Sequence, residues 1–111
     1  MVARRTPSRG DVYLVALDPT HGHEIRKTRP CVIVSPDELN AFLRTVIVAP
    51  MTSKSRPAGF RVPISFQGTD GLILLEQSRA LDKTRLIRQL GAAPPATLSR
   101  ALAVLRELYE E

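Results

Sequence analysis

Short segments rich in β-branched and aromatic residues recur along most of the chain, and turn-forming residues separate them. Each segment is five to seven residues long, which is a usual length for a strand and too short for most helices. Where apolar side chains occupy alternate positions, a strand presents one face to the core and the other to solvent. The expected strands are residues 11–17, 31–35, 45–49, 60–66, 72–78 and 86–90.

The segment 60–66 is expected at an edge of the sheet. Its apolar side chains alternate with polar ones or proline in the order Phe60, Arg61, Val62, Pro63, Ile64, Ser65, Phe66. Proline donates no backbone hydrogen bond and is therefore tolerated mainly on edge strands. This strand should border solvent or a partner.

Helices are expected between and after the strands. Ser35 followed by Pro36, with Glu38 three residues after the serine, predicts a capped helix over residues 36–42. Residues 82–85 should form a short helical turn before the last strand. After two prolines, apolar residues at helical spacing predict an amphipathic C-terminal helix whose stripe is Leu98, Leu102, Leu105 and Tyr109.

These elements predict a mainly β (α+β) fold, a small β-barrel of five to seven strands with short helices and a C-terminal amphipathic helix. The 111 residues fit a single domain, 1–111. A domain of this size buries roughly two-thirds of the surface that its unfolded chain exposes, so one core is sufficient.

Composition narrows the class of protein. Hydrophobic residues make up 43% and charged residues 24%, which is a globular composition, and neither a membrane span nor a signal peptide is visible. We therefore expect a cytoplasmic protein. The single Cys31 lies in an apolar segment and is expected to be a buried small hydrophobe. The net charge of +5 favours contact with polyanions without identifying one.

The basic residues concentrate where long loops are expected, at residues 18–30 and 51–59. Loops of this length inside small domains are often functional. His21 and His23 raise the alternatives of a metal site or an acid–base pair, but two histidines without further Cys or His form a poor zinc signature. We expect no metal and no cofactor.

Several motifs, spread over most of the chain, resemble the MazF/PemK family of toxins. The longest run begins at Arg9, and the similarity weakens after Gly91. The residues that carry it are Arg9-Gly10-Asp11-Val12-Tyr13, Leu17-Asp18-Pro19-Thr20, Gly22, Glu24, Lys27, Arg29-Pro30, Val32-Ile33-Val34-Ser35, Val48-Ala49-Pro50-Met51-Thr52-Ser53, Gly71-Leu72 and Glu76-Gln77-Ser78-Arg79.

The resemblance implies an SH3-like barrel that forms a homodimer and cuts single-stranded RNA at a short preferred sequence. It also implies an acidic, MazE-like antitoxin partner that covers the RNA groove. By position, Arg29 matches the arginine regarded as catalytic, Thr52 matches its paired threonine, and Glu24 matches an acidic residue of the same loop. His23 and the segment 55–58 depart from the common pattern, so base preference does not follow from the resemblance.

The matched residues suit RNA cleavage without metal, in which the ribose 2′-hydroxyl attacks the neighbouring phosphate. Arg29 offers a planar fork of donors to phosphate oxygens, and Thr52 adds a hydroxyl donor. Arginine is a poor base, so the base is left open between Glu24 and Arg29, with His23 as a further proton donor. The expected RNA contacts are Thr20, Lys27, Ser53, Lys54, Arg56, Gln77, Arg79 and Lys83.

Two other classes of protein compete with this interpretation. A gyrase-poisoning toxin resembling CcdB would act through its C-terminal end, but this chain ends in Tyr109-Glu110-Glu111 without the tryptophan of those toxins. A barrel that binds RNA without chemistry would not need Arg29 and Thr52 together. Incubation with RNA separates a nuclease from both alternatives.

Overall fold

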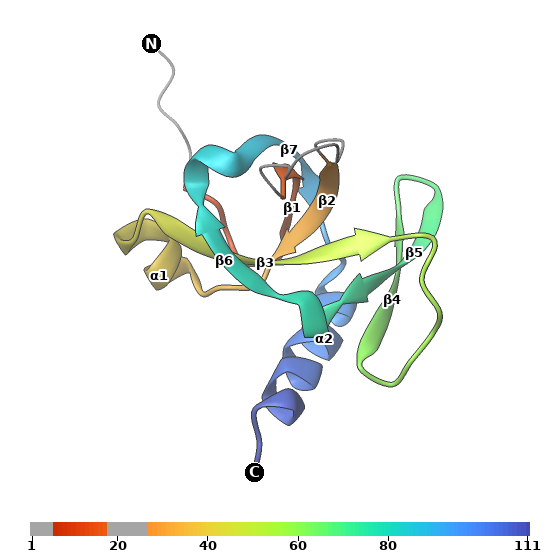
Figure 1. Ribbon diagram of the computed structural model, residues 1–111. Coiled ribbons are helices and arrows are strands. Elements are labelled where there is room, and N and C mark those ends of the chain that lie inside the picture. The colour runs from red at the N-terminus through yellow and green to blue at the C-terminus, as the bar shows by residue number, and fades with distance from the viewer. Residues whose placement is uncertain (1–5, 18–26) are drawn as a thin grey trace, which may run out of the picture.

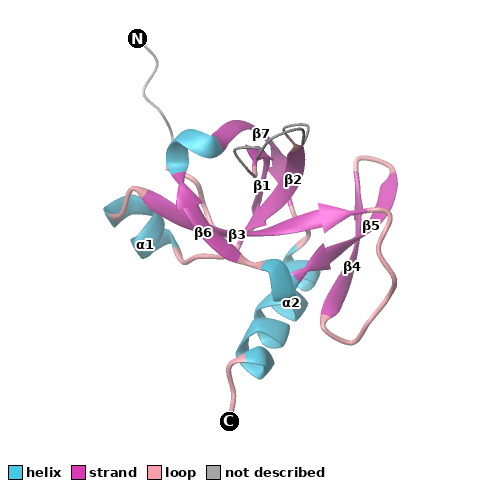
Figure 2. Cartoon of the chain, in the orientation of Figure 1, coloured by secondary structure: helices cyan, strands magenta, loops and turns pink. Residues whose placement is uncertain are grey.

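One curled antiparallel sheet organises the chain (Figures 1 and 2). The structure, a computed structural model, describes residues 6–17 and 27–111. The strands within these ranges are β1 (Asp11–Ala16), β2 (Thr28–Ile33), β3 (Thr45–Thr52), β4 (Arg61–Phe66), β5 (Thr69–Leu74), β6 (Arg79–Asp82) and β7 (Leu86–Ala92). The helices are α1 (Asp37–Phe42), the 3-10 turns η1 (Leu75–Gln77) and η2 (Lys83–Arg85), and α2 (Pro95–Leu108).

Strand β3 links the two parts of the sheet. The strand order is β4-β5-β3-β2-β1-β7, and β6 also pairs with β3. The first half of β3 pairs with β6, whereas its last residues, Met51 and Thr52, pair with β5. The predicted mainly β fold with a C-terminal helix is confirmed, and the sheet forms a half-barrel whose end strands are β4 and β7. The predicted edge position of residues 60–66 is confirmed as well.

Side chains bridge the two end strands of the half-barrel. Gln67 and Gly68 form the turn between β4 and β5, and both have positive φ angles, 51° and 79°, as two-residue hairpin turns require. The Gln67 Nε2 donates a hydrogen bond of 3.0 Å to the Leu90 carbonyl of β7. A Cβ at Gly91 would lie 3.1 Å from the Phe66 ring, so glycine lets this ring sit against β7. The hairpin tip therefore closes onto β7.

Each face of the sheet carries a buried cluster. On β2, Val32 belongs to one cluster while Cys31 and Ile33 belong to the other, as strand alternation requires. The predicted burial of Cys31 is confirmed. Helix α2 covers the first cluster through buried Ala101 and the partly buried Leu98, Leu102 and Leu105. Tyr109 lies beyond the helix end and is 81% exposed, so its place in the apolar stripe was wrongly predicted. Neither α2 nor another described helix has the length and apolar character of a membrane span.

Ser35 does not cap α1, and this part of the sequence prediction is wrong. The helix spans Asp37–Phe42, close to the predicted 36–42, but its N-cap is Pro36 and no side chain caps it. The buried Ser35 hydroxyl donates to the Asn40 side-chain oxygen and accepts a 2.9 Å hydrogen bond from the Ile47 amide of β3. The Asn40 amide returns a 3.0 Å bond to the Ser35 carbonyl. A tertiary contact to the sheet thus replaces the local cap.

The observed bounds of β2 and β3 differ from the predicted strands 31–35 and 45–49, and the difference affects the site. β2 begins at Thr28 and β3 reaches Thr52, so Arg29 and Thr52 lie on strand ends rather than in loops. The expected strand 72–78 is interrupted by η1, and β6 was not predicted. The predicted helical turn at 82–85 and the strand after it are confirmed as η2 and β7.

Candidate active site

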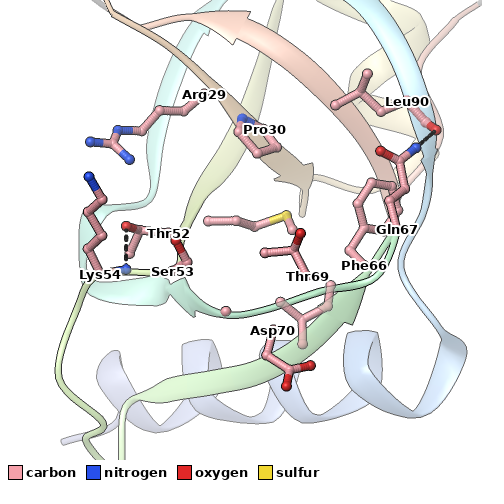
Figure 3. Close-up of a pocket in the computed structure, with 13 residues that line it drawn as sticks. Arg29, Pro30, Thr52, Ser53, Lys54, Phe66, Gln67, Thr69, Asp70 and Leu90 are labelled. Atoms are coloured by element: carbon pink, nitrogen blue, oxygen red, sulfur yellow. Dashed lines mark hydrogen bonds between the residues drawn. The ribbon is translucent and has the colours of Figure 1, made fainter.

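A pocket of about 340 Å³ opens between the ends of β2 and β3, the β4–β5 hairpin and β7 (Figure 3). Its volume lies near the lower end of the range for small-ligand sites, roughly 300–1,000 Å³. The pocket has a cationic end and an opposite end at the hairpin tip, joined by an apolar floor.

The cationic end contains Arg29 and Thr52, two of the three residues predicted to be catalytic. Arg29, half-buried on β2, faces Val15 of β1 in the strand register. Thr52 is the last residue of β3, and its Oγ1 accepts a 3.2 Å hydrogen bond from the Lys54 amide, which starts the following loop. In Figure 3 the Arg29 guanidinium and the Lys54 ammonium point into the same end of the pocket. Two charged donors and a hydroxyl therefore meet in one place.

No ion pair within the described residues reaches the cations at this end, although the Asp70 carboxylate lines the same pocket. Elsewhere, Arg61 makes a 2.8 Å ion pair with Glu76. In contrast, the side chains of Arg29 and Lys54 form no hydrogen bond or ion pair with residues 6–17 or 27–111. An arrangement of this kind is suited to an anionic ligand, and phosphate oxygens match the fork of a guanidinium.

Gly71 fixes the position of Thr52 from the neighbouring strand. A Cβ at Gly71 would lie 2.8 Å from the Thr52 carbonyl oxygen, closer than real Cβ contacts come. The absence of a side chain lets β5 lie tightly against the end of β3, where Thr52 pairs with Leu72. Gly71 also lines the pocket.

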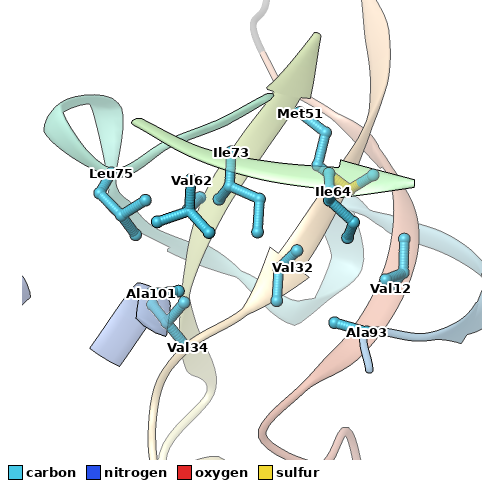
Figure 4. Close-up of a cluster of buried hydrophobic side chains, with 11 residues drawn as sticks. Val12, Val32, Val34, Met51, Val62, Ile64, Ile73, Leu75, Ala93 and Ala101 are labelled. Carbon is cyan, nitrogen blue, oxygen red and sulfur yellow. The ribbon is translucent and has the colours of Figure 1, made fainter. Parts of the chain in front are cut away.

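The floor of the pocket is part of the core. Pro30, Met51 and Ile64 line it, and Met51 and Ile64 are buried in the cluster beneath α2 (Figure 4). Packed core side chains resist displacement, so the two ends of the pocket are held at a fixed separation.

The hairpin end holds residues that sequence reasoning missed. Phe66, Gln67, Thr69 and Leu90 line it. Phe66 could be recognised as an apolar strand position, but nothing in the sequence around Gln67 distinguishes it from an ordinary turn residue. Its role in the wall depends on Leu90 of β7, which lies 23 residues further along the chain.

Cys31 lies beside the cationic end without lining the pocket. Burial raises the pKa of its thiol to about 12, although the nearby charges of Arg29 and Arg79 act in the opposite direction. A thiol with this pKa stays protonated at neutral pH and is a poor nucleophile. The positive charges of Arg29 and of Arg79 on β6 therefore act on the same thiol.

The structure gathers only some of the predicted site residues. Arg29, Thr52, Ser53 and Lys54 line the pocket. Glu24, Thr20 and His23 lie outside the described residues. The other predicted RNA contacts do not line the pocket and are Lys27 before β2, Arg56 in the loop after β3, Gln77 on η1, Arg79 on β6 and Lys83 on η2.

Comparison with known proteins identifies similar chains. The family model of PemK-like, MazF-like toxins of type II toxin–antitoxin systems matches residues 8–109. Endoribonuclease PemK of Escherichia coli is 39% identical over 103 residues, covering 87% of this chain and 77% of that protein. Endoribonuclease toxin ChpB of Escherichia coli K12 is 35% identical over 117 residues, covering 99% and 100%. The MazE–MazF crystal structure from Deinococcus radiodurans gives a TM-score of 0.83 at 28% identity, covering 95% of this chain and 96% of that chain.

Proposed function

The chain belongs to the family of PemK-like, MazF-like toxins of type II toxin–antitoxin systems, and we propose that it cuts single-stranded RNA at a preferred sequence, without a metal ion, in the pocket around Arg29 and Thr52. It is an endoribonuclease toxin of this type, as its PemK and ChpB relatives are. The observation that carries the finer proposal is the convergence of Arg29, Thr52 and Lys54 on one end of the pocket.

The proposed reaction is an internal transfer within the RNA. The ribose 2′-oxygen loses its proton to a base and bonds to the adjacent phosphorus, while the bond from phosphorus to the 5′-oxygen breaks and that oxygen takes up a proton. The products are a 2′,3′-cyclic phosphate and a 5′-hydroxyl end. Arg29 and Lys54 stabilise the charge that grows on the phosphate, and Thr52 donates a hydroxyl hydrogen bond to the same group.

Two residues stay candidates for the base. Glu24 accepts a proton readily as a carboxylate, whereas a guanidinium such as that of Arg29 holds its proton strongly. Whichever group takes the proton, the electrostatic role of Arg29 is the same. The cations of the pocket supply positive charge at the phosphate, which is the contribution that a metal ion makes in other nucleases.

The proposal extends to the partners of the chain. As a toxin of a type II system it has an antitoxin. We expect that antitoxin to be acidic and to place carboxylates near Arg29 and Lys54, because opposite charges steer association and occupy the phosphate position. We further propose a homodimer that acts in the cytoplasm, with the end strand β4 near a partner surface.

The test is cleavage of an unstructured RNA by the purified chain in excess chelator. Fragments should carry 5′-hydroxyl ends, which a kinase labels without prior phosphatase treatment, and 2′,3′-cyclic phosphates. An Arg29→Ala preparation purified in parallel controls for contaminating ribonuclease. Loss of cleavage in chelator with recovery on added magnesium or zinc would overturn the metal-free mechanism, and 5′-phosphate ends would overturn the 2′-hydroxyl attack.

A further inference from the structure

The amide of Gln67 is fixed in one orientation at the hairpin end of the pocket. The Leu90 carbonyl can only accept a hydrogen bond, so the Gln67 side chain must present its Nε2 to it, at 3.0 Å. The Oε1 atom then faces the other way, across the pocket toward Pro30 (Figure 3). A hydrogen-bond acceptor is thus held in place without a ligand.

The surroundings of this acceptor are suited to a flat, partly apolar group. Phe66 and Leu90 lie beside Gln67 (Figure 3), and the apolar side chains of Pro30 and Met51 also line the pocket. Aromatic and apolar walls accept a nucleobase by stacking and packing, while one or two polar atoms read its edge. The whole pocket is close in size to a single small ligand.

The backbone of Gln67 gives an independent reason to look for a role. Its φ angle of 51° lies in the left-handed region, where glycine, asparagine and aspartate are the favoured residues of a hairpin turn. A glutamine at this position is conformationally unfavourable, and such exceptions cluster at functional sites.

We propose that the Phe66, Gln67 and Leu90 end of the pocket is a nucleobase subsite, and that Gln67 Oε1 determines part of the cleavage sequence by accepting a hydrogen bond from a base next to the cut phosphate. The inference rests on the proposed RNA cleavage at the cationic end, since a phosphate there places a neighbouring base over the floor. It assigns the reading of this base to Gln67 and not to Gln77, one of the RNA contacts expected from the sequence. Gln77 lies on η1 and does not line the pocket.

The variant Gln67→Met tests the subsite because it keeps the length of the side chain and removes its hydrogen bonds. The readout is the base composition around the cut, obtained by sequencing the 5′ ends of fragments from a random RNA pool. Preference at one position beside the cut should fall by up to about tenfold, the order expected for losing one hydrogen bond. Cleavage of the RNA pool as a whole should continue.

Gln89→Met is the matched control. In the wild type, the Gln89 Nε2 also donates to a carbonyl of β7, that of Gly91 at 3.2 Å, but Gln89 does not line the pocket. It should leave the sequence preference unchanged. If Gln67→Met only lowered cleavage equally at all sequences, together with thermal stability, its bond to Leu90 would be structural and the subsite would be disproved.

Two more outcomes separate this inference from the proposed function. A wild-type chain that cuts no RNA contradicts the function itself. A wild-type chain that cuts with a clear preference, unchanged in Gln67→Met, contradicts the subsite alone, and a preference that changes in Gln77→Met instead assigns the contact to η1.

Discussion

Two clusters of polar side chains in this molecule satisfy their hydrogen-bonding groups in opposite ways. At the Ser35–Asn40 corner, both side chains are buried and bond to each other and to the backbone of β3. At the cationic end of the pocket, Arg29 and Lys54 share a space without an acidic partner among the described residues. The first cluster is satisfied internally, whereas the second keeps charged donors that no described residue uses.

We expect the Ser35–Asn40 corner to contribute to stability and the cationic end to contribute to activity. Unpaired like charges close together raise the free energy of the folded state, and functional sites are where folds retain such arrangements. The corner, in contrast, replaces the water lost on burial with protein partners. Substitutions in the two clusters should therefore affect different measurements.

The largest effect is expected at the cationic end. Arg29→Ala and Thr52→Ala should each lower cleavage by about a hundredfold or more, because each removes a donor that we propose for the transition state. Thermal stability should change little, since neither side chain belongs to a buried cluster. Steady-state cleavage of a fluorescent RNA and thermal melting measure the two effects.

Arg100→Ala is the matched control for charge, because Arg100 is exposed on α2 and does not line the pocket. It should retain nearly normal cleavage. Folded Arg29 and Thr52 variants that cut RNA at the wild-type rate would show that the pocket is not the active site.

The corner should respond in the reverse manner. Ser35→Ala leaves the Ile47 amide and the Asn40 side chain without their partner, which should lower the free energy of unfolding by about 1–3 kcal/mol. Cleavage by the folded protein should be preserved under native conditions. Urea unfolding measures the loss, and Ser99→Ala on the exposed face of α2 should show none. A catalytic defect in Ser35→Ala without a loss of stability would break the distinction between the clusters.

The two clusters also differ in how far the sequence predicts them. Arg29 and Thr52 could be identified because each belongs to a motif that matches the family in sequence. The sequence placed both in loops, whereas the structure places them at strand ends. Ser35 was misassigned because Ser-Pro-Asp-Glu fits a helix cap locally, and only the distant Ile47 amide shows where its hydroxyl is used.

Other features escaped prediction for similar reasons. η1 divides residues 72–78 after Leu74, and an apolar segment of this kind does not show where a strand bends. The place of Gln67 in the pocket wall could not be predicted, because it requires the curl of the sheet that brings β7 to the hairpin tip. Periodicity predicts which face of a strand is buried, but it does not predict which two ends of a sheet meet.

The smallest effect on activity is expected at Cys31, which lies next to the cationic end and belongs to neither of the two polar clusters. Cys31→Ala should leave cleavage within about twofold of wild type, because a buried, protonated thiol takes no part in the reaction.

Burial raises the pKa of Cys31 from its ordinary value of 9.0 to about 12, so the folded chain binds this proton more tightly than the unfolded chain. The resulting stabilisation is complete below about pH 9 and is lost as the pH rises toward about 12. Urea unfolding of wild type and Cys31→Ala across this range isolates the contribution of the thiol: their difference in stability should shrink as the pH rises. Rapid labelling of Cys31 in the folded wild type at about pH 8, at the rate of the unfolded chain, would show instead that the thiol beside Arg29 is accessible and ionised.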